Sequence, residues 1–154
     1  MKFYLVQHGE AKSKEEDPQR RLTAQGEEDV RRVAEFARQA GVAIAEIHHS
    51  GKRRAEQTAE ILAEHLRPQR GLHAVPGLAP MLDVEPAAQA LGSESASLML
   101  VGHLPFLSKL ASRLLAGVTY RPVICFKMGG IVCLERGDDG DWTVAWMVTP
   151  DILR

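Results

Sequence analysis

Three clusters of polar residues in the sequence combine side chains that could handle a phosphoryl group. They are Gln7-His8-Gly9-Glu10, the segment from Ser50 to Thr58 with Arg53 and Arg54, and Gly102-His103-Leu104-Pro105. A histidine can act as a nucleophile or carry a proton, and a planar guanidinium matches the oxygens of a phosphate. These residue types indicate phosphoryl chemistry if the fold brings the clusters together.

Each residue also has a purely structural explanation when it is taken alone. His8 is compatible with a hydrogen-bonded histidine at a strand end, and Arg54 with a solvated or ion-paired side chain in a first helical turn. His103, two residues before Pro105, is compatible with a helix cap region. Taken together they favour a site, because all three follow predicted strands and would lie at the same edge of a sheet.

The elements that must position these clusters alternate along the chain. Strands are predicted from apolar runs or from alternation at 2–7, 44–48, near 73–75, 97–102, 130–136 and 142–148. Helices are predicted from Thr23 to Gly41, from about 55 to Pro68, and from Pro105 to about 114. This alternation predicts an α/β fold with a mostly parallel sheet and helices on both faces. Two of the clusters also lead into helix N-termini, which favour anions.

Length and composition limit the class of protein. The 154 residues are 45% apolar and 25% charged, which is typical of one globular domain, 1–154. A net charge of −1 without charge blocks argues against a nucleic-acid or membrane-surface partner. The sequence suggests neither a secretory signal nor a membrane span, so a cytoplasmic location is expected. Cys125 and Cys133 are expected to be buried and reduced. Oligomeric state is left open.

The clusters resemble the signature motifs of the histidine phosphatase superfamily. Leu5 to Ala11 is similar to its Arg-His-Gly motif, Ser50 to Ala59 to its Ser-x-x-x-Arg-Ala-x-Gln-Thr-Ala motif, and Val101 to Pro105 to the motif with the second histidine. Asp17 to Thr23, with Gly26, resembles the Arg-Pro-Leu-Thr loop of the SixA-like branch, the small bacterial phosphohistidine phosphatases. The resemblance extends to at least residue 136 and implies a phosphoglycerate mutase-like fold.

The resemblance also implies a covalent mechanism. His8 would attack phosphorus, and water would hydrolyse the phosphohistidine intermediate. Arg54 and His103 would line the phosphate pocket together with Gln7, and Arg20 would help from the loop. The clustered positive charge would disfavour the imidazolium form of His8. No cofactor is implied, and His48, His49, His65 and His73 show no metal-ligand pattern.

Two departures from the family pattern affect the expected chemistry. Gln7 occupies the position of the motif arginine, and a neutral hydrogen bond contributes roughly 1 kcal/mol where a charged one contributes about 1.5–3 kcal/mol. The pocket should therefore hold phosphate less strongly. No carboxylate matches the general acid of larger members; Asp83 and Glu10 are candidates by position alone. Imidazole leaves more easily than an alkoxide, so a missing acid favours a phosphohistidine substrate.

Three functions therefore stay open, in a definite order. The leading hypothesis is an enzyme that removes phosphate from a histidine-phosphorylated signalling or phosphotransfer protein. The second is a phosphomonoesterase for a small phosphorylated substrate, which needs Asp83 or another carboxylate as acid. The third is a phosphate-binding or phosphoprotein-binding module that lost turnover when Gln7 replaced arginine.

Overall fold

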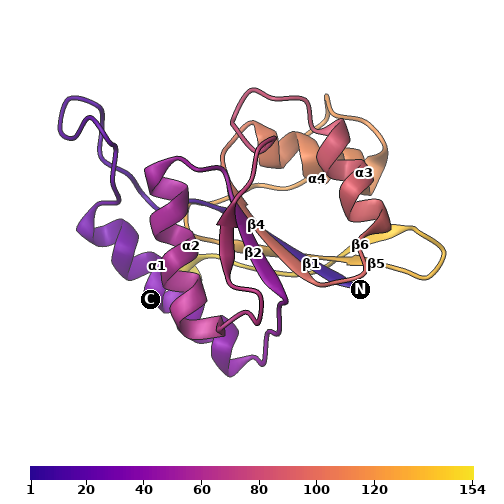
Figure 1. The fold of residues 1–154 in the computed structure, drawn as a ribbon, viewed down its shortest axis with the longest axis horizontal. Helices are drawn as coiled ribbons and strands as arrows, with labels where there is room; N and C mark the ends of the chain where they lie inside the picture. The colour runs from indigo at the N-terminus through magenta and orange to yellow at the C-terminus, as the bar shows by residue number, and fades with distance from the viewer.

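A mixed sheet of six strands forms the centre of the molecule, with helices on both of its faces (Figure 1). The structure is a computed structural model that describes residues 1–154. The strands are β1 Lys2–Gln7, β2 Glu46–His49, β3 Leu72–Ala74, β4 Leu98–Gly102, β5 Ile131–Arg136 and β6 Trp142–Val148. The helices are α1 Ala24–Gln39, α2 Arg53–Leu66, α3 Glu85–Ser93 and α4 Phe106–Ala116, with a 3-10 turn at Pro150–Leu153.

The strand order, β3-β2-β4-β1-β5-β6, confirms the predicted α/β fold with a mostly parallel sheet. Strands β3, β2, β4 and β1 run parallel to one another, because helical crossovers connect them. The last two strands break this pattern: β5 is antiparallel to β1, and β6 returns antiparallel to β5 as a hairpin. Antiparallel pairing is therefore confined to the side of the sheet that holds β5 and β6.

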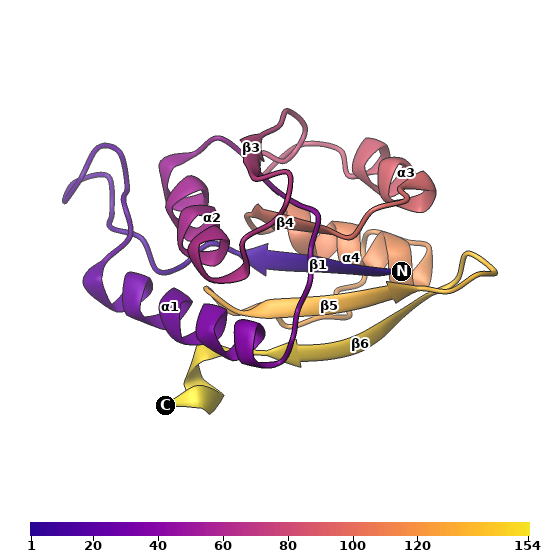
Figure 2. The ribbon, with the colours of Figure 1, turned by 60° about the horizontal axis from the view of Figure 1, so that its bottom comes forward.

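Helices α1 and α2 cover one face of the sheet, and α3 and α4 cover the other (Figure 2). Along β1, Tyr4 and Val6 pack into the core under α1 and α2, whereas Phe3 and Leu5 pack under α3 and α4. Burial on both faces explains why the first strand is an almost continuous apolar run. The same strand ends at the polar residues Gln7 and His8.

The helix ends follow the local chemistry of the sequence. Thr23 caps α1 by accepting the Gly26 amide at 2.9 Å, and Gly41 follows the helix with a φ of 76°. Helix α2 ends just before Pro68. Helix α3 was not expected from the sequence, and it buries only Ala88 and Leu91.

The two cysteines lie in different environments. Both are free, and Cys133 is buried in β5 as expected. Cys125 is exposed, which corrects the expectation that it is buried, because it lies in the segment between α4 and β5. No helix is long and apolar enough to cross a membrane.

Candidate active site

The sheet order brings the three polar clusters to one edge. Strand β4 lies between β2 and β1, so the carboxyl ends of these three parallel strands are neighbours, as predicted. The amide of His8 donates to the carbonyl oxygen of Gly102 at 3.0 Å, which joins the first cluster directly to the third. The rings of His8 and His103 lie with their centroids 5.1 Å apart and their planes 51° apart.

The ring of His8 is held in one tautomer. Its Nδ1 lies 2.7 Å from the carbonyl oxygen of Gly9, and because a carbonyl can only accept, Nδ1 carries the proton. The pKa of His8 is lowered to about 4, mainly by burial and also by the charges of Arg54 and Arg20, against the opposing effect of the Gly9 bond. At neutral pH the ring is therefore uncharged, and Nε2 keeps a free lone pair.

His103 is the more deeply buried of the two histidines, with 2% of its surface exposed. Its Nε2 lies 2.6 Å from the hydroxyl oxygen of Ser50, and its Nδ1 is buried without a hydrogen-bond partner in the protein. Burial lowers the pKa of His103 to about 3, and the neighbouring His8 and Arg54 act in the same direction. The ring is thus neutral at physiological pH, with one unpaired nitrogen.

The two arginines at the start of α2 have different partners. Nη1 of Arg53 contacts the carboxylates of Glu56 at 2.7 Å and Glu60 at 3.1 Å. Arg54 forms no ion pair of this kind, and its Nε is buried without a partner. Of these two arginines, Arg54 is the one whose charge lowers the pKa of both His8 and His103. It lies in the first turn of α2, where the helix dipole also favours an anion.

Arg20 reaches the same site from the loop between β1 and α1. Its φ of 50° is in the left-handed region, and its Nε donates to the carbonyl of Lys12 at 3.1 Å. Asp17 organises the loop, since its carboxylate accepts from the amides of Gln19 and Arg21 and from the Arg21 guanidinium. The charge of Arg20 lowers the pKa of His8, His103 and Arg54.

Gln7 and the two candidate acids have separate surroundings. Gln7 is the β-sheet partner of Gly102 at the end of β1, and the backbone carbonyl of Gln7 accepts the Gly129 amide at 2.9 Å. Oε1 of Glu10 accepts from the Thr23 hydroxyl at 2.8 Å, and Oδ1 of Asp83 accepts from the Glu85 amide at 3.0 Å. Both carboxylates are exposed and take part in local hydrogen bonds.

Two hydroxyl groups in the second motif have roles that the sequence did not assign. Thr58 is fully buried; it accepts the Gly9 amide at 3.0 Å and donates to the Arg54 carbonyl at 2.8 Å. Ser50 bonds to His103, as described above. A spacing of four residues on a helix allows the Thr58 bond to Arg54, but its bond to Gly9 spans 49 residues, so only the fold reveals it.

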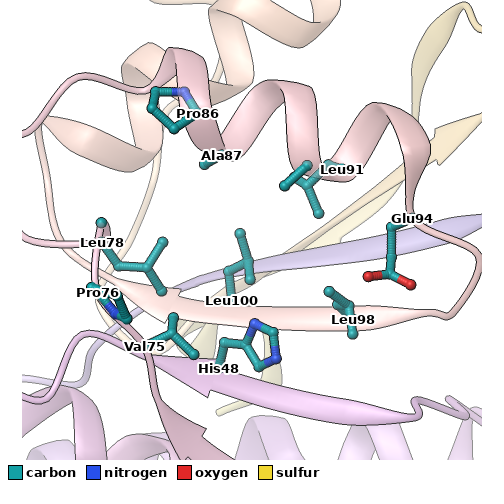
Figure 3. A pocket seen from close by; sticks show the side chains of 12 residues that line it. His48, Val75, Pro76, Leu78, Pro86, Ala87, Leu91, Glu94, Leu98 and Leu100 are labelled. Atoms are coloured by element: carbon teal, nitrogen blue, oxygen red, sulfur yellow. The ribbon is translucent and has the colours of Figure 1, made fainter.

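A cavity of about 230 Å³, which neither His8 nor His103 lines, lies between α3 and the strands β2 and β4 (Figure 3). Its lining is mainly apolar, from Leu98 and Leu100 on β4 and from Leu91 on α3. His48 points toward it from β2, and Glu94 lies at the end where α3 finishes. An apolar lining with a carboxylate does not suit phosphate. No three side chains of the His, Cys, Asp or Glu types are grouped to hold a metal ion.

Residues 3–80 match the family model of the histidine phosphatase superfamily, branch 1. Phosphohistidine phosphatase SixA of Escherichia coli (strain K12) is 30% identical over 159 aligned positions, which cover all of this chain and 97% of that protein. The chain belongs to the histidine phosphatase superfamily. This confirms the resemblance recognised in the sequence motifs, including that to the SixA-like branch.

Solved structures with the same fold include two phosphatases. The structure of protein histidine phosphatase SixA complexed with tungstate superposes with a TM-score of 0.88 over the whole of both chains, at 28% identity. A phosphoserine phosphatase from Entamoeba histolytica, in complex with 3-phosphoglyceric acid, shares the fold with a TM-score of 0.72 and 17% identity over 99% of each chain. Membership of the superfamily supports phosphatase activity.

Proposed function

We propose that this histidine phosphatase is a phosphohistidine phosphatase in which Nε2 of His8 attacks phosphorus. The observation that carries the proposal is the bond from Nδ1 of His8 to the Gly9 carbonyl, which leaves Nε2 unprotonated beside Arg54 and His103. A lone pair on a neutral ring is what a nucleophilic histidine needs. The similarity to SixA and to its tungstate complex supports the same assignment, because tungstate is an oxyanion like phosphate.

The reaction proceeds in two displacements at phosphorus. In the first, the Nε2 lone pair of His8 forms an N–P bond while the bond from phosphorus to the substrate nitrogen breaks, and the leaving group takes a proton from solvent. In the second, water attacks phosphorus and releases a proton to solvent, the N–P bond of His8 breaks with its electron pair returning to Nε2, and inorganic phosphate departs. Arg54 and Arg20 stabilise the charge on the phosphoryl oxygens throughout. Neither displacement uses a metal ion or a cofactor.

The substrate class follows from the missing general acid. With a pKa of about 3, His103 is not an imidazolium at neutral pH and acts as a hydrogen-bonding group. Glu10 and Asp83 are engaged in local hydrogen bonds with Thr23 and Glu85. An imidazole leaving group needs little help from an acid, whereas an alkoxide needs much. A histidine-phosphorylated signalling or phosphotransfer protein is therefore the substrate that this site fits best.

Turnover of two small substrates tests the proposal. We expect hydrolysis of phosphoramidate, which has a P–N bond as phosphohistidine does, and little hydrolysis of an alkyl phosphate such as glycerol 2-phosphate, whose alkoxide leaving group needs an acid. Comparable rates on both would overturn the phosphohistidine assignment in favour of a phosphomonoesterase. If the protein binds inorganic phosphate but hydrolyses neither substrate, it is a phosphate-binding module and not an enzyme. A histidine-phosphorylated carrier protein should then be hydrolysed with a higher kcat/KM than phosphoramidate.

A further inference from the structure

We propose that Ser50 is a positioning residue that fixes the proton of His103 on Nδ1, so that this nitrogen can donate to a phosphoryl oxygen. The inference rests on the proposed function, since it assigns a role at the same site. Its basis is the contact of 2.6 Å between the hydroxyl oxygen of Ser50 and Nε2 of His103. No other side chain is hydrogen-bonded to the ring of His103.

The direction of this hydrogen bond follows from the other partner of Ser50. A serine hydroxyl has one proton to donate and two lone pairs that accept. The backbone N–H of Lys52 donates to the Ser50 oxygen at 3.3 Å, so it uses one of the lone pairs. In the protein, Nε2 of His103 is the only group placed to accept the hydroxyl proton of Ser50. Ser50 is therefore assigned as the donor, which uses its proton as well as a lone pair, and Nε2 as the acceptor.

The tautomer of His103 is then determined. A neutral imidazole carries one proton, and an Nε2 that accepts from Ser50 leaves that proton on Nδ1. Nδ1 is buried, and a buried N–H without a partner is costly. The surroundings of the ring are basic, since Arg54, Lys52 and Arg20 all act on it. An N–H donor in such surroundings fits an oxyanion, whereas the opposite tautomer would present a lone pair and repel it.

The fold builds this arrangement from two neighbouring strands. Ser50 follows β2 and His103 follows β4, and these strands pair in parallel register. Gly51 has a φ of 90°, a conformation that favours glycine, and it turns the chain so that the Lys52 amide returns to Ser50. Lys52 is also the N-cap residue of α2. The hydrogen bonds from Lys52 to Ser50 and from Ser50 to His103 therefore start at the helix that carries Arg54.

The proton positions can be read directly by NMR of the imidazole nitrogens at pH 7, with His103 assigned by its loss in His103→Asn. We expect the wild type to show a protonated Nδ1 and an unprotonated Nε2. Ser50→Ala should give a mixture of tautomers and bind tungstate roughly five- to tenfold more weakly. Ser50→Thr, which keeps a hydroxyl, should restore both readouts. Ser93→Ala, an exposed serine at the end of α3, is the matched control and should change neither.

Two results would overturn the proposal. One is a wild-type His103 with its proton on Nε2, because Ser50 would then be an acceptor. The other is a folded Ser50→Ala variant with an unchanged tautomer and unchanged tungstate affinity. If Ser50→Ala does not fold, the wild-type spectrum alone still tests the proposal, because it shows which nitrogen of His103 carries the proton. Neither readout needs turnover, so a failure of phosphoramidate hydrolysis would count against the proposed function and not against this tautomer.

Discussion

The hydroxyl of Thr58 accepts the amide N–H of Gly9 at 3.0 Å, so helix α2 is bonded directly to the residue that follows His8. The same hydroxyl donates to the carbonyl of Arg54 at 2.8 Å. Gly9 in turn provides the carbonyl that fixes the ring of His8. One buried side chain thus connects the proposed nucleophile to the first turn of α2, which carries Arg54, the arginine proposed to bind phosphate.

Thr58→Val tests this connection, because valine keeps the shape and removes the hydroxyl. The buried Gly9 amide would lose its acceptor, and we expect the free energy of unfolding to fall by about 1–3 kcal/mol. A displaced His8 ring should lower kcat/KM by about ten- to a hundredfold. Denaturant unfolding and phosphoramidate turnover measure the two effects. Thr143→Val, at an exposed position of β6, is the control. A Thr58→Val variant as stable and active as the wild type would show that the link is unimportant.

His8→Ala should abolish turnover and leave the fold intact, because the covalent route disappears with the nucleophile. His103→Ala should be severely impaired but keep some activity. Labelled phosphate trapped on the wild type should be acid-labile and base-stable, as a phosphohistidine is, and should be absent from His8→Ala. His73→Ala removes an exposed histidine of β3 and should behave as the wild type. Near-normal activity in a stable His8→Ala variant would exclude His8 as nucleophile.

The low pKa of His8 predicts an unusual acid limb in the pH profile. An ordinary histidine nucleophile gains its proton near pH 6.5, but burial lowers the pKa of His8 to about 4. Activity should therefore be kept as the pH falls from 6.5 to about 5 and be lost near pH 4. The measurement is kcat/KM on phosphoramidate, corrected for ionisation of the substrate.

Arg20→Gln provides the matched variant for this profile. Removing a positive charge near His8 should raise its pKa and move the acid limb to higher pH, whereas Arg70→Gln, at an exposed position before β3, should leave it in place. An acid limb near pH 6.5 in the wild type would contradict the proposed environment of His8.

Gln7→Arg should strengthen the binding of phosphate. The difference between a charged and a neutral hydrogen bond, about 1 kcal/mol or somewhat more, corresponds to roughly a five- to tenfold tighter inhibition by phosphate. The backbone bonds of Gln7 to its neighbours do not depend on its side chain, so the fold should tolerate the change. Turnover rises as well only if the new charge acts more strongly on the transition state than on bound phosphate. Phosphate inhibition constants and kcat/KM for both proteins provide the comparison. Weaker inhibition with slower turnover would mean that the pocket is adapted to glutamine.

The sequence predicted the parts of this site that depend on local order. Each cluster directly follows a predicted strand, so the position of His8 and His103 at one sheet edge could be inferred before the strand order was known. Contacts between distant segments could not be predicted, because nothing local specifies them: Ser50 and His103 are 53 residues apart. Helix α3 was missed because a short helix with two buried residues has little hydrophobic periodicity. The roles of Gln7, Arg20 and Arg54 at phosphate stay predictions.

The central position of β1 affects how the protein is made. Strand β1 comes before all of its partners in the sequence; it pairs with β4 on one side and with β5 on the other, and the amide of Gly129 bonds to the carbonyls of Gln7 and His8. A nascent chain that ends before Gly129 therefore contains every motif residue, but one edge of β1 is unpaired. An unpaired apolar edge favours association with other chains. We expect such truncated translation products to aggregate, and His8, which is synthesised early, to become functional only after residues 129–154 have been added.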